Sequence, residues 1–449
     1  MAQGPAPALT DSADWPRFGY DLHNTRFNAG EKILGPSNVG RLKLRWSHEI
    51  GAPIQSAPVI VDNTLYTGAW DGCYYALDAR SGAGIWKYDA GISPQGPWNL
   101  REIRSTAQYD EGKIYFGTGE GDVICVEATT GKEIWKTKVD PHPSCNISSS
   151  PTVYGDRVFI GTSADNSQIA CLDSDTGAVR WRFYIVPDRT DGGGGVWTSA
   201  AVDEEQGIVY NVTGHPRSFT PPGPLLYTES ILANDLETGE LLWYYQVRSM
   251  DPWDLDFSCH PMIFDAVSPG KRGAGRRCVG AGNKTGFFTC DRYTGELLWR
   301  TMLTNWSTQG GLEWNSTAFA DNKVYVVSNA VNEERDLDTG RSVGLSESVT
   351  AALHAYTGEI VWWRHNEAMN KSPVCVANGV FYQSLVDGSL EAYDSETGKQ
   401  LWKSSMPSSS HGGIVIANGE LYTSNGEASS PPPEPKSQYS VFAYSIDGR

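Results

Sequence analysis

Residues 282–299, with the sequence GNKTGFFTCDRYTGELLW, contain the pattern that decides the fold. A short apolar run leads into Asp291, Gly295 follows four residues later, and Trp299 comes after another four. Asp accepts hydrogen bonds from nearby backbone amides, and Gly supplies the positive φ of a tight hairpin turn. The stretch therefore predicts two antiparallel strands joined by a turn, with Trp299 in the second strand.

The same Gly and Trp, four residues apart, recur along the chain. Seven copies are present: Gly82/Trp86, Gly131/Trp135, Gly177/Trp181, Gly239/Trp243, Gly295/Trp299, Gly358/Trp362 and Gly398/Trp402. Upstream of the turns lie pairs of short apolar runs, such as SAPVIVDNTLYTG at 56–68, which predict two further strands. One repeat is thus a four-stranded antiparallel meander of roughly 40 to 60 residues, the size of a propeller blade.

An eighth copy is divided between the two ends of the chain. Residues 412–449 supply three strands but no Trp, whereas LKLRWSHEI at 42–50 contains Trp46. Joining the two ends completes a blade and removes the exposed sheet edges that an open array would leave. We therefore predict an all-β, eight-bladed propeller of four-stranded antiparallel blades, closed by pairing of the N- and C-terminal strands. Trp46 is expected in the outermost strand of the last blade, antiparallel to FAYS at 442–445.

Residues 1–449 are predicted to form this single propeller domain, with an N-terminal arm at 1–40 and a Pro-rich loop at 427–438. Long insertions at 216–229 and 331–348 interrupt the repeat, and loops of this length in compact domains are usually functional. We expect both insertions near a central mouth of the ring.

Composition narrows the classes of function. The net charge of −17 argues against nucleic acid or an anionic membrane as a partner, because both bind clustered cations. No apolar run approaches the ~18 residues of a transmembrane helix, so the chain is expected to be soluble. The N-terminus lacks the pattern of a signal peptide, but six Asn-x-Ser/Thr sequons would permit glycosylation. A secreted or periplasmic location and a cytoplasmic one are therefore equally expected.

Charged and aromatic residues stand beside the turns at one end of the predicted blades. They are Gln55, Arg104, Trp197, Asp254 and Lys284. The innermost strands of a propeller start at the central channel, so residues from several blades can converge there. Any one of them taken alone has the more common role of a surface ion pair or a core aromatic. The eight scattered cysteines show no metal-binding or haem-attachment spacing.

Several motifs resemble the quinoprotein dehydrogenases that use pyrroloquinoline quinone (PQQ), in particular the polyvinyl-alcohol-dehydrogenase-like branch. They are the Gly–Trp repeat, DWPRFGYDLHNTRFN at 14–28, GGGGVWTSAAVD at 192–203, DPWDLD at 251–256 and NKTG at 283–286. The resemblance extends from Trp15 to the end of the chain. It implies an eight-bladed propeller that oxidises an alcohol or polyol, a small-molecule substrate, and passes the electrons to an external acceptor.

The resemblance also implies residue roles. Asp254 matches the catalytic base, Lys284 the cation that contacts the quinone carbonyls, and Trp197 the aromatic surface under the quinone ring. Arg104 matches a second cation that faces the quinone, and Gln55 a contact to a quinone carboxylate. A flat polyanion needs a stacking surface and cations, and removal of hydride from an alcohol needs a base for the hydroxyl proton.

This sequence departs from the family at three positions. The family holds Ca²⁺ with a Glu, an Asn and the catalytic Asp, so the implied metal ligands here are Asp254 and Asn166, which stands at the Glu. His215 stands at the Asn, and imidazole is a poor ligand for a hard cation. It therefore becomes a candidate catalytic residue. Glu313 stands at an Asn that contacts the cofactor.

Three functional classes stay open. The first is the quinone-dependent dehydrogenase, to which Arg104, Trp197, Asp254 and Lys284 point. The second is a cofactor-free propeller enzyme in which His215, Asp254, Glu313 and Lys284 catalyse cyclisation, elimination or hydrolysis of a small organic molecule. The third is a binding propeller like those that assemble outer-membrane proteins.

Overall fold

The structure is a computed structural model of the chain. It describes residues 13–449 except 94–101, 165–166, 188–191, 218–223, 271–274, 306–309, 332–333, 336–341, 344–345 and 427–438. The predicted Pro-rich loop at 427–438 and the candidate metal ligand Asn166 lie outside these residues, as do parts of both insertions.

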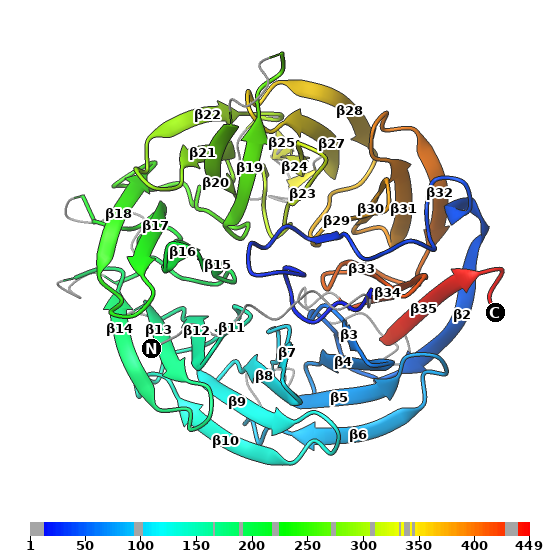
Figure 1. The fold of residues 1–449 in the computed structure, drawn as a ribbon, viewed down its shortest axis with the longest axis horizontal. Helices are drawn as coiled ribbons and strands as arrows, with labels where there is room; N and C mark the ends of the chain where they lie inside the picture. The colour runs from blue at the N-terminus through cyan, green and yellow to red at the C-terminus, as the bar shows by residue number, and fades with distance from the viewer. Residues whose placement is uncertain are drawn as a thin grey trace.

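Eight four-stranded antiparallel sheets are arranged as blades around a ring (Figure 1). Consecutive strands pair with each other in the first five blades and in the seventh, and in the first seven blades the first strand lies nearest the middle of the ring. The prediction of an all-β, eight-bladed propeller is therefore confirmed. In the described part of the chain, no helix is long and apolar enough to cross a membrane.

The first four blades have nearly identical strand lengths. Blade one contains β3 (Val59–Val61), β4 (Thr64–Gly68), β5 (Cys73–Asp78) and β6 (Gly84–Asp89). Blade two contains β7 (Gln108–Asp110), β8 (Lys113–Gly117), β9 (Asp122–Glu127) and β10 (Glu133–Lys138). Blade three contains β11 (Thr152–Tyr154), β12 (Arg157–Gly161), β13 (Gln168–Asp173) and β14 (Val179–Tyr184). Blade four contains β15 (Ala201–Asp203), β16 (Ile208–Val212), β17 (Ser230–Asp235) and β18 (Leu241–Gln246).

The next three blades carry the irregular features. Blade five contains β19 (Met262–Val267), β20 (Gly275–Asn283), β21 (Gly286–Asp291) and β22 (Leu297–Thr301). Blade six contains β23 (Ala318–Ala320), β24 (Lys323–Val331), β27 (Ser346–His354) and β28 (Ile360–Asn366), with the inserted pair β25 (Glu334–Arg335) and β26 (Ser342–Val343). Blade seven contains β29 (Cys375–Ala377), β30 (Val380–Ser384), β31 (Ser389–Asp394) and β32 (Gln400–Ser405).

The eighth blade is built from both ends of the chain. The C-terminal residues form β33 (Ile414–Ala417), β34 (Glu420–Ser424) and β35 (Ser440–Ile446), and a short 3₁₀ helix (Val39–Arg41) leads into β2 (Leu42–Glu49). Strand β2 pairs with β35 in antiparallel register, and Trp46 stands opposite Ala443. The predicted closure of the ring is therefore confirmed.

Seven of the eight blade tryptophans, all except Trp402, pack against the turn glycine of the next blade. The indole of Trp46 donates a hydrogen bond to the carbonyl of Ala79 at 2.9 Å, and a Cβ on Gly82 would lie 2.6 Å from its ring. The same pair of contacts recurs from Trp86 on Gly131 through Trp362 on Gly398. The repeated Gly therefore provides the positive φ of the hairpin and also makes room for an indole.

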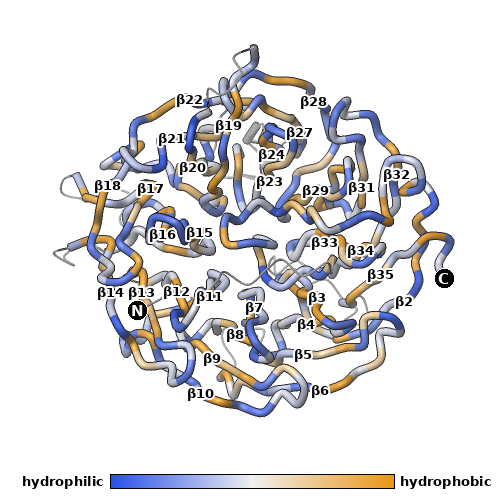
Figure 2. The backbone as a smooth tube through the Cα atoms, viewed as in Figure 1, coloured by the Kyte–Doolittle hydropathy of each residue, from blue (hydrophilic) through white to orange (hydrophobic). Residues whose placement is uncertain are grey.

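The inner strands of each blade are buried on both faces, because neighbouring blades pack against them. All five residues of β16 are buried, whereas exposed and half-buried residues alternate along β18. Figure 2 shows both hydrophilic and hydrophobic stretches along the outer strands, for example β10. All eight cysteines are buried and none forms a disulfide.

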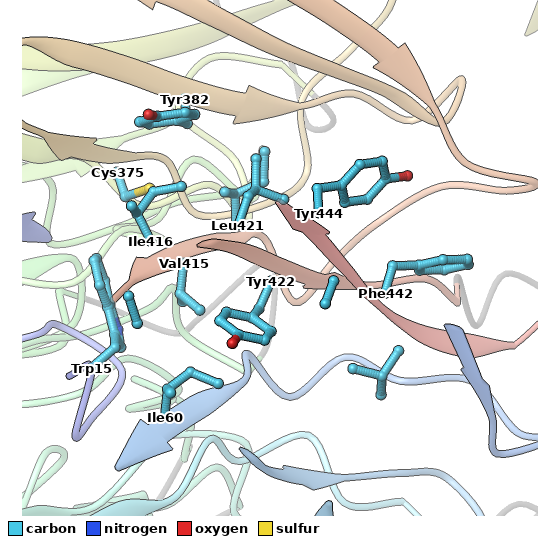
Figure 3. Close-up of a cluster of buried hydrophobic side chains, with 14 of the residues drawn as sticks. Trp15, Ile60, Cys375, Tyr382, Val415, Ile416, Leu421, Tyr422, Phe442 and Tyr444 are labelled. Atoms are coloured by element: carbon cyan, nitrogen blue, oxygen red, sulfur yellow. The ribbon is translucent and has the colours of Figure 1, made fainter. Parts of the chain in front are cut away.

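Residues 13–28 run across the middle of the ring as part of its packing (Figure 1). Trp15 joins the buried cluster between blades one, seven and eight, near Ile60 and Val415 (Figure 3). The Asn24 side-chain amide donates to three carbonyl oxygens of blades four and five at 3.1 Å. Strand β1 (Phe27–Asn28) adds a fifth, parallel strand to blade seven. The N-terminal arm thus braces several blades.

Candidate active site

The loops that lead into the first strands of the blades surround a cavity of about 440 Å³. Every blade contributes at least one lining residue within four positions of the start of its first strand. In blade order, examples are Gln55, Thr106, Ser150, Ser199, His260, Ser316, Pro373 and His411. The repeat architecture therefore brings together side chains that are hundreds of residues apart in sequence.

The structure places seven predicted site residues on this one cavity. They are Gln55, Arg104, Trp197, His215, Asp254, Lys284 and Glu313. The eighth, Asn166, lies outside the described residues. Their chemical roles stay predictions.

Two carboxylates and two basic groups form a compact network in the cavity. The Lys284 Nζ lies 3.1 Å from Oδ1 of Asp254 and 3.1 Å from Oδ1 of Asp256. The His215 Nδ1 lies 3.0 Å from Oδ1 of Asp254 and 3.4 Å from Oδ2 of Asp256. The carboxylates are thus each shared between an ammonium and an imidazole.

This network controls the ionisation of its members. Burial would lower the pKa of His215, but hydrogen bonds to Asp254 and Asp256 outweigh it and raise the pKa to about 9. Burial likewise opposes the charge of Lys284, and the three neighbouring carboxylates raise its pKa. Burial would raise the pKa of Asp254, but the hydrogen bond from His215 and the Lys284 charge lower it. At neutral pH, Asp254 is ionised between two positive charges.

Glu313 titrates differently although it lies only 3.9 Å from Lys284. Its side chain is 2% exposed, and burial raises its pKa to about 7 against the opposing charges of Lys284 and Lys371. A carboxyl group with a pKa near neutrality can exchange a proton at physiological pH. Glu313 is therefore an acid of the cavity that can change its charge near neutral pH.

Trp197 forms a flat surface in the cavity wall between two glycines. A Cβ on Gly195 or on Gly214 would overlap its ring, so only glycine fits at either position. The indole nitrogen donates to the carbonyl of Phe257 at 3.3 Å, and the ring lies 6.3 Å from that of His215. The glycine-rich segment before Trp197 therefore sets the orientation of its ring.

Arg104 lies at another part of the cavity between two indoles. Its guanidinium carbon is 4.7 Å from the Trp70 ring and 5.9 Å from the Trp314 ring, and it pairs with Glu102 at 3.0 Å. Burial, together with the charges of Lys371 and Arg104, lowers the pKa of His411 to about 3. The His411 imidazole is thus neutral at neutral pH, whereas Lys371 and Arg104 near it are positively charged.

Local hydrogen bonds shape the turn that presents Asp254. Its φ of +58° lies in the left-handed region, which Asp tolerates better than most residues. The Asp251 carboxylate accepts hydrogen bonds from the amides of Trp253, at 2.9 Å, and Leu255. The Lys284 amide donates to the Asp256 carbonyl at 3.2 Å. The acid and the lysine are therefore attached to each other through backbone as well as side chains.

Among the lining residues that sequence reasoning missed are Asp256, Trp314, Lys371 and His411. Asp256 could have been found from DLD, because residues two apart often point the same way in an extended segment. Lys371 could have been found by position, because it precedes β29 as Arg104 precedes β7. Nothing in the local sequence marks His411 as different from a surface histidine.

Three side chains of the cavity, His215, Asp254 and Asp256, are grouped closely enough to hold a metal ion. One ligand atom from each of His215, Asp254 and Asp256 lies within 4.8 Å of the others. Two carboxylates suit a hard cation such as Ca²⁺, whereas a protonated imidazole does not. The described donors therefore fit a calcium site only through Asp254 and Asp256.

Comparison with known proteins is consistent with this geometry. A family model described as the glucose/ethanol/alcohol dehydrogenase β-propeller domain matches residues 15–310, and a model of the outer-membrane protein assembly factor BamB matches residues 288–429. Among curated proteins, the quinohemoprotein alcohol dehydrogenase ADH-IIG of Pseudomonas putida is 25% identical, with 93% of this chain and 71% of that protein covered. The polyvinylalcohol dehydrogenase of a Pseudomonas species is 24% identical, with 94% and 74% covered.

A solved structure shows the same fold at larger sequence distance. A europium-containing methanol dehydrogenase superposes with a TM-score of 0.83 at 21% identity, and the match covers 98% of this chain and 99% of that one. The homologues of this chain are thus alcohol dehydrogenases with a PQQ-type propeller. Because the family model matches more than half of the residues, the chain belongs to the glucose/ethanol/alcohol dehydrogenase β-propeller family.

Proposed function

We propose that the chain is a PQQ-dependent dehydrogenase that oxidises an alcohol or polyol in this cavity at the centre of the propeller. The electrons would pass to an external acceptor. The observation that carries the proposal is the placement of Trp197, packed between two glycines, beside the Asp254–Lys284 pair. Family membership adds to it, because relatives named as alcohol dehydrogenases cover almost the whole chain.

The residues present fit a flat, polyanionic quinone. Several buried polar atoms at the cavity have no hydrogen-bond partner among the described residues, among them Arg104 Nε, Ser163 Oγ, Thr198 Oγ1, His260 Nδ1 and Glu313 Oε2. Buried polar atoms are rarely left unpaired, so such a set favours a polar ligand. Trp197 would stack on the ring, Gln55, Arg104 and Lys284 would contact its oxygens, and Glu313 would border it.

The chemistry divides between the cofactor and the protein. The quinone, when bound, supplies the acceptor for the two electrons that the alcohol loses. Asp254 is ionised, because Lys284 and His215 stabilise its negative charge, and it is therefore in the base form that would take the hydroxyl proton. His215 holds the carboxylate in place and carries a positive charge at neutral pH. If a hard cation binds as well, Asp254 and Asp256 would hold it.

A second candidate function is favoured by the protonation states of the cavity. Glu313, with a pKa of about 7, and the His215–Asp254 pair could exchange protons with a substrate without a quinone. Cyclisation, elimination or hydrolysis of a small organic molecule would then replace alcohol oxidation.

Replacement of the base tests the proposal. We expect Asp254→Asn to lower dye-linked alcohol oxidation by about 10²–10⁴-fold, because general bases contribute this much to rate. The quinone should stay bound, because the indole surface is intact, and Asn also tolerates the left-handed backbone at this position. Activity with a series of alcohols and a dye, together with the quinone content, is the measurement.

Asp265→Asn is the matched control, because Asp265 lies in β19 of the same blade with a side chain that is 64% exposed. Its activity should equal that of the unmodified protein. Full alcohol oxidation by Asp254→Asn would contradict the assignment of the base. Quinone-free turnover of a substrate by the unmodified protein would instead favour the second candidate.

A further inference from the structure

A half-buried arginine, Arg248, contacts the turns that carry the cavity's acids and bases. Arg248 follows β18, and its side chain is 19% exposed. Its Nε lies 2.9 Å from a carboxylate oxygen of Glu229, whose side chain is fully buried. Its NH2 donates to the carbonyl of Leu255 at 3.3 Å and to Asn283 Oδ1 and Thr285 Oγ1 at 3.4 Å. One guanidinium thus contacts two separate turns.

These two turns carry the residues of the proposed chemistry. Leu255 stands between Asp254 and Asp256, and Asn283 and Thr285 flank Lys284. The Asn283 side chain strengthens the connection, because its amide donates to the Leu255 carbonyl at 2.7 Å. Arg248 therefore acts on both members of the Asp254–Lys284 pair through their chain neighbours.

Glu229, the partner of Arg248, is hydrogen-bonded to the residue before His215, which is the third member of the network. The Glu229 amide donates to the carbonyl of Gly214 at 2.9 Å, next to His215. Burial and then a hydrogen bond with Asp251 raise the pKa of Glu229 to about 10, so it is protonated at neutral pH. Asp251 in turn holds the Trp253 and Leu255 amides. Arg248, Glu229 and Asp251 together carry one positive and one negative charge, so neither ion is left without an opposite charge.

We propose that Arg248 is a positioning residue that fixes Asp254, Lys284 and His215 relative to one another without touching substrate or cofactor. A guanidinium suits this role because its planar donors can bind several acceptors in fixed directions, which an ammonium cannot do. The proposal deepens the proposed function and, for its effect on turnover, rests on it.

Replacement of Arg248 by Met in the full-length protein tests the proposal. We expect kcat for dye-linked alcohol oxidation to fall at least tenfold while the Kd for PQQ stays within about threefold. Small displacements of reacting groups lower the rate, whereas the indole surface is unchanged. Amide hydrogen exchange without quinone should become at least tenfold faster in residues 249–259 and 280–287. Arg248→Lys should restore part of the protection and of kcat.

Arg292→Met is the matched control, because Arg292 forms ion pairs with Asp203 at 3.1 Å and Asp265 at 3.2 Å away from this cavity. It should change neither kcat nor exchange in the two segments. If Arg248→Met does not fold, Arg248→Lys is measured in its place. Unchanged exchange in both segments, or equal losses of kcat and quinone affinity, would overturn the proposal. Failure of the unmodified protein to bind PQQ would contradict the proposed function alone, because the exchange measurement needs no quinone.

Discussion

At the scale of single residues, the cavity is defined by how burial and neighbouring charge divide its titratable groups. His215 and Lys284 stay charged because carboxylates surround them, whereas Glu313 and His411 tend to the neutral form because burial dominates. Sites that push such groups apart in pKa are typical of enzymes. Asp254 and Glu313 both lie near Lys284 but differ in pKa, and this difference can be tested by measuring stability against pH.

Glu313→Gln should stabilise the protein increasingly as pH rises. The pKa of Glu313 is about 7 in the folded chain against an ordinary value of 4.5, so the native state holds a proton that the unfolded state releases. Its contribution to stability is thus present below about pH 4.5 and lost as pH rises through 7. We expect the variant to gain on the order of 2 kcal/mol, relative to the unmodified protein, between pH 4.5 and pH 8.

Denaturant unfolding at a series of pH values is the measurement. The exposed Glu240 supplies the control, and Glu240→Gln should show no such trend. An advantage of Glu313→Gln that is the same at pH 4.5 and pH 8 would show that Glu313 is ionised like an ordinary glutamate.

At the scale of elements, the blade is locked to its neighbour by one indole and one glycine. The repeat was readable from sequence because both residues recur at a fixed spacing. That the glycine also makes room for an indole could not be predicted, because the tryptophan that packs on it belongs to the preceding blade. Asp256 and Lys371 were missed although their positions could have marked them, because Asp256 is two residues after Asp254 and Lys371 precedes β29 as Arg104 precedes β7.

Two glycines of blade four allow the need for a positive φ and the need for space beside an indole to be tested separately. Gly239 has a φ of +75° and its added Cβ would lie 2.5 Å from the Trp181 ring, whereas Gly207 has a φ of +67° and open space. Gly207→Ala should cost about 1–2 kcal/mol for the left-handed backbone alone. Gly239→Ala should cost about 1–3 kcal/mol more, because the indole must move. Denaturant unfolding of both variants is the measurement. Equal losses of stability would contradict the claim that the Trp181 indole packs on Gly239.

At the scale of the whole molecule, closure of the ring is what brings the loops of all eight blades to one cavity. The split eighth blade and the polar loop residues were predictable because each follows from the repeat. The path of residues 13–28 across the ring was not, since their contacts are hydrogen bonds from side chains such as Asn24 to distant carbonyls. The Arg248 network was equally hidden, because Arg248 follows the last strand of blade four whereas its acceptors Leu255 and Thr285 lie in the loop before blade five and in blade five.

The central claim is that this closed ring binds a quinone on Trp197 at its middle. Calorimetric titration of the full-length protein with PQQ, with and without Ca²⁺, tests it most directly. We predict one quinone per chain, and an affinity at least several-fold lower for Trp197→Ala, because stacking on an indole is worth about 1 kcal/mol or more. Absence of binding to the unmodified protein under both conditions would contradict the claim.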